Sequence, residues 1–165
     1  MPRVSNHEAP ANPGHFWFPL PALTPLDCWS TRIIGDTMYT GKHAHLRPLQ
    51  PAFIMASTGE AVTYAELEAR SNRLAHFLRR RGLKWLDHYA IFMENNSNYL
   101  EACGAGERSG LYFTCVNSYL TASELAYIVT NSESRILITS RAKLDVVREA
   151  LSQCARLELC VVVDG

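Results

Sequence analysis

The sequence predicts an α/β fold: a partial open parallel sheet with flanking helices, preceded by a small β-hairpin. Four short apolar runs rich in β-branched and aromatic residues lie in the C-terminal half of the chain, and helical stretches separate them. The runs cover 88–93, 111–116, 135–139 and 159–163. Strands that alternate with helices of about ten residues are typical of βαβ units, whose crossovers are right-handed.

The stretches between these runs predict three helices, at 97–109, 122–129 and 142–154. Thr121 and Glu124 form a capping box at the start of the second helix. In the third, apolar residues recur at helical spacing and predict a face toward the core: Leu144, Val147, Leu151 and Cys154.

Two further strands, 51–56 and 61–64, are predicted to form the hairpin, with a turn at 57–60 that contains Gly59. A second capping box, Thr63 to Glu66, begins the longest helix, and Gly82 ends it. One stripe of this helix is apolar: Leu67, Leu74, Ala75 and Leu78. Charged residues are expected on its solvent side: Glu66, Glu68, Arg70, Arg73 and Arg79.

The composition indicates a soluble globular protein without a polyanionic partner. The chain has 16 basic and 16 acidic residues, so its formal net charge is zero. This balance gives no indication of nucleic-acid or anionic-membrane binding. The five cysteines are odd in number and lack C-x-x-C spacing, which favours a reducing, cytoplasmic setting. No apolar run reaches the roughly eighteen residues of a membrane span, and no signal peptide is evident.

Residues 1–37 form an irregular, proline-rich extension. Three interpretations stay open: a flexible arm, an arm that docks on the domain, or sequence upstream of the natural start. Met38 lies just before the regular patterning begins, so we treat it as an alternative start to Met1.

Polar residues follow the predicted strands at their carboxyl ends: Glu94–Asn96, Asn117–Ser118, Ser140 and Asp164–Gly165. Ligands of open parallel sheets bind at this edge, so these residues are candidates for the rim of a binding crevice. The alternative is that they cap helices and form turns. Caps are needed at every such junction, so the second interpretation is favoured for any one residue.

The segment Gly104-x-Gly106-x-x-Ser109 approaches a dinucleotide-binding fingerprint, but it lies late in a predicted helix and its third position is not glycine. We therefore interpret its small residues as allowing close helix packing. His43 and His45 lack further ligands for a metal site. Walker, G-x-S-x-G and H-E-x-x-H motifs are absent, so the sequence assigns no catalytic, cofactor-binding or metal residue.

Several segments resemble the adenylate-forming (AMP-binding) superfamily, in the same order and with similar gaps. They are Val62–Leu67, Ser71–Ala75, Ala90–Asn96, Gly110–Asn117, Leu120–Ile128 and Ser132–Thr139. The sequences of these segments most resemble those of fatty-acid-type acyl-CoA synthetases of actinobacterial kind. The resemblance covers 38–165 and identifies this region as the first part of an AMP-binding synthetase N-terminal domain, truncated inside that domain.

The resemblance implies a two-step ligase reaction that uses ATP, magnesium, a small-molecule carboxylate and coenzyme A. The family's catalytic elements lie further along a longer chain and have no matching position here, so no catalytic residue is carried over. One departure is Leu86-Asp87, where the family usually has Gly-Asp, so the loop is expected to differ in structure.

Three hypotheses follow. The first is an N-terminal fragment of an AMP-forming fatty acid–CoA ligase that is inactive on its own. The second is a non-catalytic α/β binding module, and the third is a truncated pseudogene product. The last predicted strand has no following helix to cover one face, as a parallel strand normally requires.

Overall fold

The computed structural model describes residues 40–164, and the proline-rich extension over 1–37 and the alternative start at Met38 lie outside this range. Its main sheet is parallel throughout, with the order β4-β3-β5-β6. The strands are β3 (His88–Phe92), β4 (Tyr112–Cys115), β5 (Ile136–Thr139) and β6 (Leu159–Val162). The predicted fold class is therefore confirmed.

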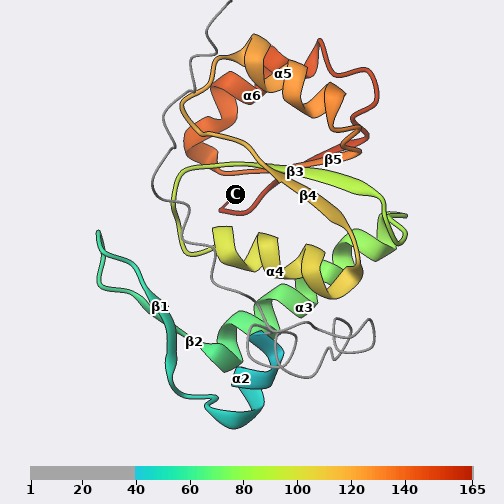
Figure 1. Ribbon diagram of the computed structural model, residues 1–165. Coiled ribbons are helices and arrows are strands. Elements are labelled where there is room, and N and C mark those ends of the chain that lie inside the picture. Colours follow the sequence, from blue (N-terminus) through green and yellow to red (C-terminus); the bar gives the residue numbers. More distant parts are fainter. Residues whose placement is uncertain (1–39, 165) are drawn as a thin grey trace, which may run out of the picture.

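Helices cover both faces of this sheet (Figure 1). One face carries α3 (Tyr64–Arg80) and α4 (Tyr99–Ser109), and the other carries α5 (Ala122–Asn131) and α6 (Leu144–Leu151). A short 3-10 turn, η2 (Arg141–Lys143), precedes α6. None of the helices within residues 40–164 is both long and apolar enough to cross a membrane.

Side chains alternate along β3 between two hydrophobic clusters, which explains why this strand has no polar face. Tyr89, Ile91 and Met93 pack toward α3 and α4, whereas Ala90 and Phe92 pack toward α5 and α6. All five are at most 2% exposed. The strand β6 differs, because all four of its residues are only partly buried. The core therefore centres on β3 and β5.

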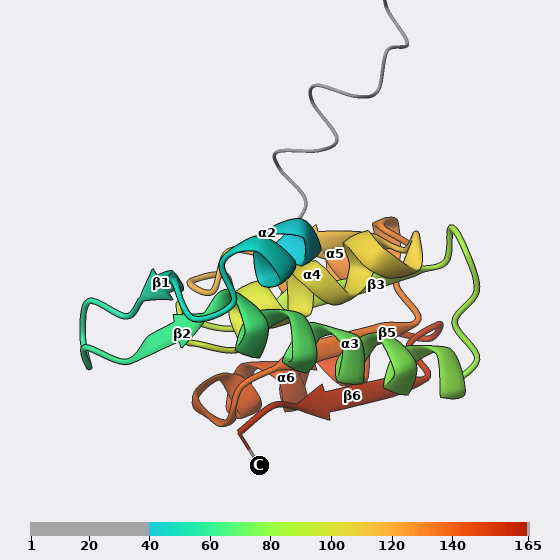
Figure 2. The same ribbon diagram turned by 90° about the horizontal axis from the view of Figure 1, so that it is seen from below.

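The predicted hairpin is confirmed as β1 (Pro51–Ile54) and β2 (Ala61–Thr63), which pair antiparallel. It projects to one side of the main sheet, next to α2 (Thr40–Leu46) and the start of α3 (Figure 2).

Both predicted capping boxes are present. In the first, the Thr63 backbone N–H donates to Glu66 Oε2 at 2.9 Å, and the Glu66 N–H donates to Thr63 Oγ1 at 3.3 Å. In the second, the Thr121 N–H donates to Glu124 Oε2 at 2.8 Å. Each box satisfies N–H groups that a helix start leaves free.

Two predictions about helix faces were wrong. Glu68 was expected on the solvent side of α3, but it forms an ion pair with Arg108 of α4, and their side chains are only 20% and 6% exposed. The reason is that α4 packs beside α3. Leu151 was expected in the core, but α6 ends there and Leu151 is 40% exposed. Ala150 occupies the buried position instead.

The glycines of α4 allow close packing, as predicted. A Cβ added at Gly106 would lie 2.5 Å from Tyr89 Oη and 2.6 Å from Phe113 Cδ1. A Cβ at Gly104 would lie 2.8 Å from Ser71 Oγ on α3. The helix therefore lies directly on the sheet on one side and on α3 on another.

Candidate functional site

The carboxyl ends of β3 and β5 are the candidate site. These strands are neighbours, but the chain leaves β3 toward β4 through α4 on one face and leaves β5 toward β6 through α6 on the other. Connections that diverge in this way open a crevice at the carboxyl edge of the sheet, where ligands of open α/β sheets bind.

A hydrogen-bond network joins the two strand ends. Ser140 Oγ donates to Glu94 Oε2 at 2.5 Å, and Asn96 Nδ2 donates to Glu94 Oε1 at 3.0 Å. Just before these residues, Thr139 Oγ1 at the end of β5 donates to the carbonyl of Phe92 at the end of β3, at 2.7 Å. Thr139 and Ser140 are fully buried. The structure therefore brings together three predicted rim residues, Glu94, Asn96 and Ser140.

The Glu94 carboxyl group is held ionised. Partial burial raises its pKa, but hydrogen bonds from Ser140 and Asn96 and the charge of Lys143 outweigh this, so the net shift is downward. A carboxylate with a lowered pKa is a poor general acid near neutral pH. Both of its oxygens accept hydrogen bonds from protein groups. The geometry therefore suits Glu94 to bracing the strand ends rather than to proton transfer.

Other predicted rim residues bond locally. Asn117 Oδ1 accepts from the Tyr119 backbone N–H at 3.0 Å, as in an Asx-turn. Asp164 Oδ1 accepts from the Arg141 N–H at 2.7 Å, at the start of the η2 turn. The cap-and-turn interpretation is confirmed for these residues. Lys143 Nζ lies 5.4 Å from the centre of the Tyr119 ring, a side chain that is 90% exposed.

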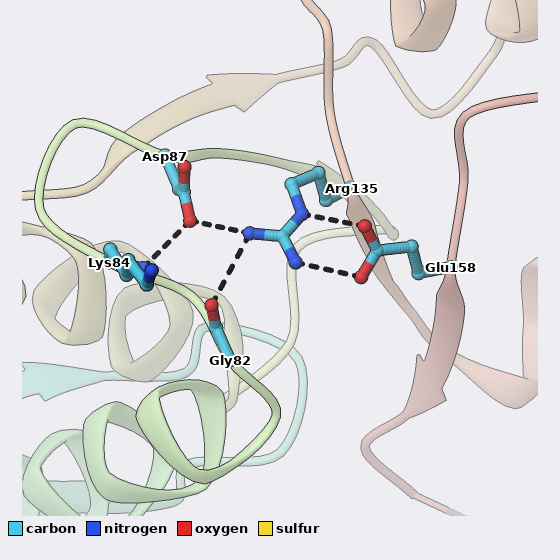
Figure 3. Close-up of polar contacts among 5 residues, drawn as sticks. All are labelled: Gly82, Lys84, Asp87, Arg135 and Glu158. Atoms are coloured by element: carbon cyan, nitrogen blue, oxygen red, sulfur yellow. Dashed lines mark hydrogen bonds and ion pairs between the residues drawn. The ribbon is translucent and has the colours of Figure 1, made fainter.

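The opposite edge of the sheet carries a charged cluster that sequence analysis missed (Figure 3). Arg135 donates to both Glu158 oxygens, at 2.7 and 2.9 Å, to Asp87 Oδ2 at 2.5 Å, and to the Gly82 carbonyl at 3.3 Å. The backbone N–H of Lys84 donates to the same Asp87 oxygen at 2.7 Å. We call Asp87, Arg135 and Glu158 the amino-edge clamp.

The members of the clamp share one position, because each directly precedes a strand: Asp87 before β3, Arg135 before β5, Glu158 before β6. Arg135 was predicted to lie within the strand 135–139, and the cluster also depends on which strands are neighbours. Hydrogen bonds to Glu158 raise the pKa of Arg135, and the same bonds lower the pKa of Glu158. The cluster is therefore a bidentate ion pair with a second carboxylate attached.

A depression of about 580 Å³ lies beside the clamp, with Glu133 and Arg156 on its rim. Its charges are already paired, since Arg156 Nη1 lies 3.1 Å from Glu133 Oε1. It also lies at the amino ends of the strands, away from the divergence of β3 and β5. We therefore interpret the clamp as a structural tie and not as a binding site.

The loop before β3 explains the departure at Leu86. This residue has φ of +69°, in the left-handed region that favours glycine. Glycine takes this backbone conformation without strain, and the neighbouring Trp85 contacts Gly110. A Cβ on Gly110 would lie 2.2 Å from Trp85 Cδ1. Trp85 therefore lies against the backbone of Gly110, and a difference between this loop and the family's stays a prediction.

The described residues do not form a site suited to a nucleoside triphosphate and its metal ion. No three His, Cys, Asp or Glu side chains gather as a metal site within 40–164. The carboxyl edge offers the Glu94 carboxylate with one nearby cation, Lys143, and the Ser140 and Asn96 side-chain donors are bonded to that carboxylate. Phosphates require cationic groups and free N–H donors. We therefore derive no catalytic step from these residues.

The parallel sheet, with helices on both faces and connections that diverge at its carboxyl edge, defines an α/β domain of the doubly wound kind. Residues 41–165 match the AMP-binding enzyme family, and the chain belongs to this family.

Curated relatives carry ligase names. The chain is 37% identical over 110 residues to a 3-oxocholest-4-en-26-oate–CoA ligase of Rhodococcus rhodochrous. The aligned segment covers 67% of this chain and 20% of the relative. It is 35% identical over 98 residues to a fatty acid–[acyl-carrier-protein] ligase of Streptomyces coeruleorubidus, in an alignment that covers 59% of this chain and 18% of the relative. The chain thus spans about a fifth of the length of these relatives.

Solved structures agree on the fold. A benzoate CoA ligase from Burkholderia xenovorans superimposes with a TM-score of 0.68 at 28% identity, over 74% of this chain and 24% of that one. A fatty acyl CoA synthetase of Mycobacterium tuberculosis gives 0.67 at 23% identity, over 76% and 26%, which supports the fold alone.

Proposed function

We propose that these 165 residues are the N-terminal part of an acyl-CoA ligase of the fatty-acid type. The complete enzyme would join a carboxylate to ATP, releasing pyrophosphate, and then pass the acyl group to coenzyme A, releasing AMP. The observation that carries this proposal is the match of 41–165 to the AMP-binding family, together with relatives named as acyl ligases.

In this proposal the chain supplies a scaffold and not the reacting groups. Adenylation requires charge neutralisation on the phosphates and the approach of two anions that repel each other. Glu94 is an anion held between Ser140 and Asn96, so it meets neither demand. Its role is to hold the ends of β3 and β5 in register at the edge where a ligand would lie. The 165 residues alone are therefore inactive.

The acyl substrate is proposed as a fatty acid of unspecified length. The names of the relatives support an aliphatic or steroid carboxylate, and they also include a 4-coumarate–CoA ligase of Humulus lupulus. They name two acceptors, coenzyme A and an acyl carrier protein. We propose coenzyme A, and a cytoplasmic location that fits the four free cysteines among the described residues.

A chimera tests the proposal. The segment of the Rhodococcus rhodochrous ligase that aligns with this chain is replaced by the corresponding residues of this chain. We expect a folded chimera that still releases pyrophosphate and forms acyl-CoA with the relative's own substrate, because both segments would build the same scaffold. The unaltered relative is the control. Cooperative unfolding would show that the chimera is folded. If a folded chimera forms no acyl-CoA, the proposal is wrong.

A fatty-acid panel then sharpens the assignment. The chimera is supplied with fatty acids of increasing length and either coenzyme A or an acyl carrier protein. Transfer to the carrier protein alone would reject the proposed acceptor.

A further inference from the structure

Two thiols from different elements meet on the α3/α4 side of the molecule. Cys103 lies in α4, and Cys115 is the last residue of β4. Their sulfur atoms are 3.9 Å apart, although the residues are twelve positions apart in the sequence. Gly106 brings α4 onto β3 and β4, because its missing side chain leaves room for Tyr89 and Phe113. The same close approach brings the two thiols together.

The two thiols differ in access. Cys115 is exposed, whereas Cys103 is half-buried. Burial, and next the neighbouring Cys115, raise the pKa of the Cys103 thiol to about 12. Thiolate is the attacking form in disulfide exchange. The exposed partner is therefore the one that meets a reagent from solution, and the half-buried partner is placed to react second.

We propose that Cys103 and Cys115 form a reversible intramolecular disulfide by exchange with a low-molecular-weight disulfide of the glutathione class. The proposal is independent of the ligase assignment, because it rests on the position and exposure of the two thiols.

The exchange has two steps. The Cys115 thiolate attacks one sulfur of the small disulfide, which forms a mixed disulfide and releases one thiolate of the reagent. The Cys103 sulfur, after losing its proton, attacks the Cys115 sulfur, which forms the protein disulfide and releases the second reagent thiolate. Two protein thiols are oxidised, one small disulfide is reduced to two thiols, and the two protons pass to those thiols through solvent. Excess small thiol reverses the reaction.

The link would fasten the first half of α4 to the carboxyl end of β4. A cross-link restricts the unfolded chain more than the folded one, so the oxidised protein unfolds at a higher temperature. The other described thiols serve as an internal control. Cys154 and Cys160 belong to the hydrophobic cluster on the opposite face of the sheet.

The experiment treats the purified 165-residue chain with oxidised glutathione under native conditions, blocks free thiols, digests with trypsin and reads the peptides by mass spectrometry. Cleavage after Lys84, Arg108 and Arg135 places the two cysteines on separate peptides, 85–108 and 109–135. We expect these peptides joined, with the loss of two hydrogens, and separated again by a reductant. Oxidation should also raise the unfolding temperature of the chain.

Variants define the order of the steps. Cys103→Ser should trap the mixed disulfide with glutathione on Cys115, and Cys115→Ser should leave Cys103 largely unmodified. Neither variant should gain thermal stability from the oxidant. In contrast, Cys160→Ser should behave as the unaltered chain does.

Three results would overturn the inference. One is a mixed disulfide that persists on Cys115 in the unaltered chain without the link. The second is a link that forms only in denaturant. The third is a link between Cys154 and Cys160 that forms as readily as the proposed one.

Discussion

The two edges of the same sheet are held together by different physics. At the amino edge, Arg135 joins Asp87 and Glu158 through ion pairs whose side chains are 28% to 51% exposed. At the carboxyl edge, the fully buried Ser140 donates to the Glu94 carboxylate. Solvent and salt weaken exposed charges but reach buried donors poorly. The stability of the carboxyl edge should therefore depend little on salt, whereas that of the amino edge should depend on it strongly.

The largest effect is expected from Ser140→Ala, which breaks the carboxyl edge. It removes a hydrogen bond to a charged acceptor inside the fold, so the free energy of unfolding should fall by about 2 kcal/mol. Denaturant unfolding measures the loss, which should be nearly the same at low and high salt. As a matched control, Ser123→Ala changes an exposed serine on α5 and should cost much less. A loss that disappears at high salt would contradict the comparison.

A somewhat smaller effect is expected from Arg135→Met, which breaks the amino edge. The change removes both ion pairs and leaves Asp87 and Glu158 without a cation, but solvent screens these groups. The free energy of unfolding should fall by about 1 kcal/mol at low salt and by less in molar sodium chloride. Arg79→Met, at an exposed position of α3, is the control. The contrary result is a cost that does not change with salt.

Acid should weaken both edges. The pKa values of Glu94 and Glu158 are lowered from 4.5 in the folded chain. A lowered carboxyl pKa stabilises the fold above the unfolded value, and this contribution is lost as pH falls through the folded value. Stability measured from pH 7 to pH 3 should therefore decline below about pH 4.5.

Glutamine variants separate the two contributions to the acid response. Both Glu94→Gln and Glu158→Gln should flatten the decline in stability with falling pH. Added salt should reduce the difference in stability between variant and unaltered chain for Glu158→Gln but not for Glu94→Gln. A decline that is identical in the unaltered chain and in both variants would contradict this account.

The smallest effect is expected at Leu86, beside the clamp. Its left-handed backbone is strained for leucine, and glycine relieves this strain while adding freedom to the unfolded chain. Leu86→Gly should raise the free energy of unfolding by about 0.5 kcal/mol, the difference of two larger opposing terms. Leu86→Ala keeps the strain and is the control. If Leu86→Gly destabilises the chain more than Leu86→Ala does, relief of backbone strain is not the main effect of the glycine substitution.

Local signals in the sequence predicted local structure. The capping boxes at Thr63 and Thr121 need only residues three positions apart, and both are present. The strand β3 was recognisable because both of its faces are apolar. The small residues of α4 pointed correctly to close packing.

Features that depend on the neighbours of an element were missed. Glu68 was placed on the wrong side because the sequence does not show that α4 lies beside α3. The clamp needs the strand order, and the thiol pair needs the distance between α4 and β4. Among the described residues, Glu94, Asn96 and Ser140 lie at the carboxyl ends of the strands as predicted, but only the structure shows that they bond to one another.

The most direct measurement of the central claim is carboxylate-dependent exchange of pyrophosphate into ATP by the purified 165-residue chain. The unaltered Rhodococcus rhodochrous ligase with its own substrate provides the positive control. If the chain is a scaffold without the reacting groups, exchange should stay at the level of the blank without carboxylate, for fatty, aromatic and steroid acids alike. Exchange that rises with one of these acids would place the catalytic groups within these residues and contradict the account.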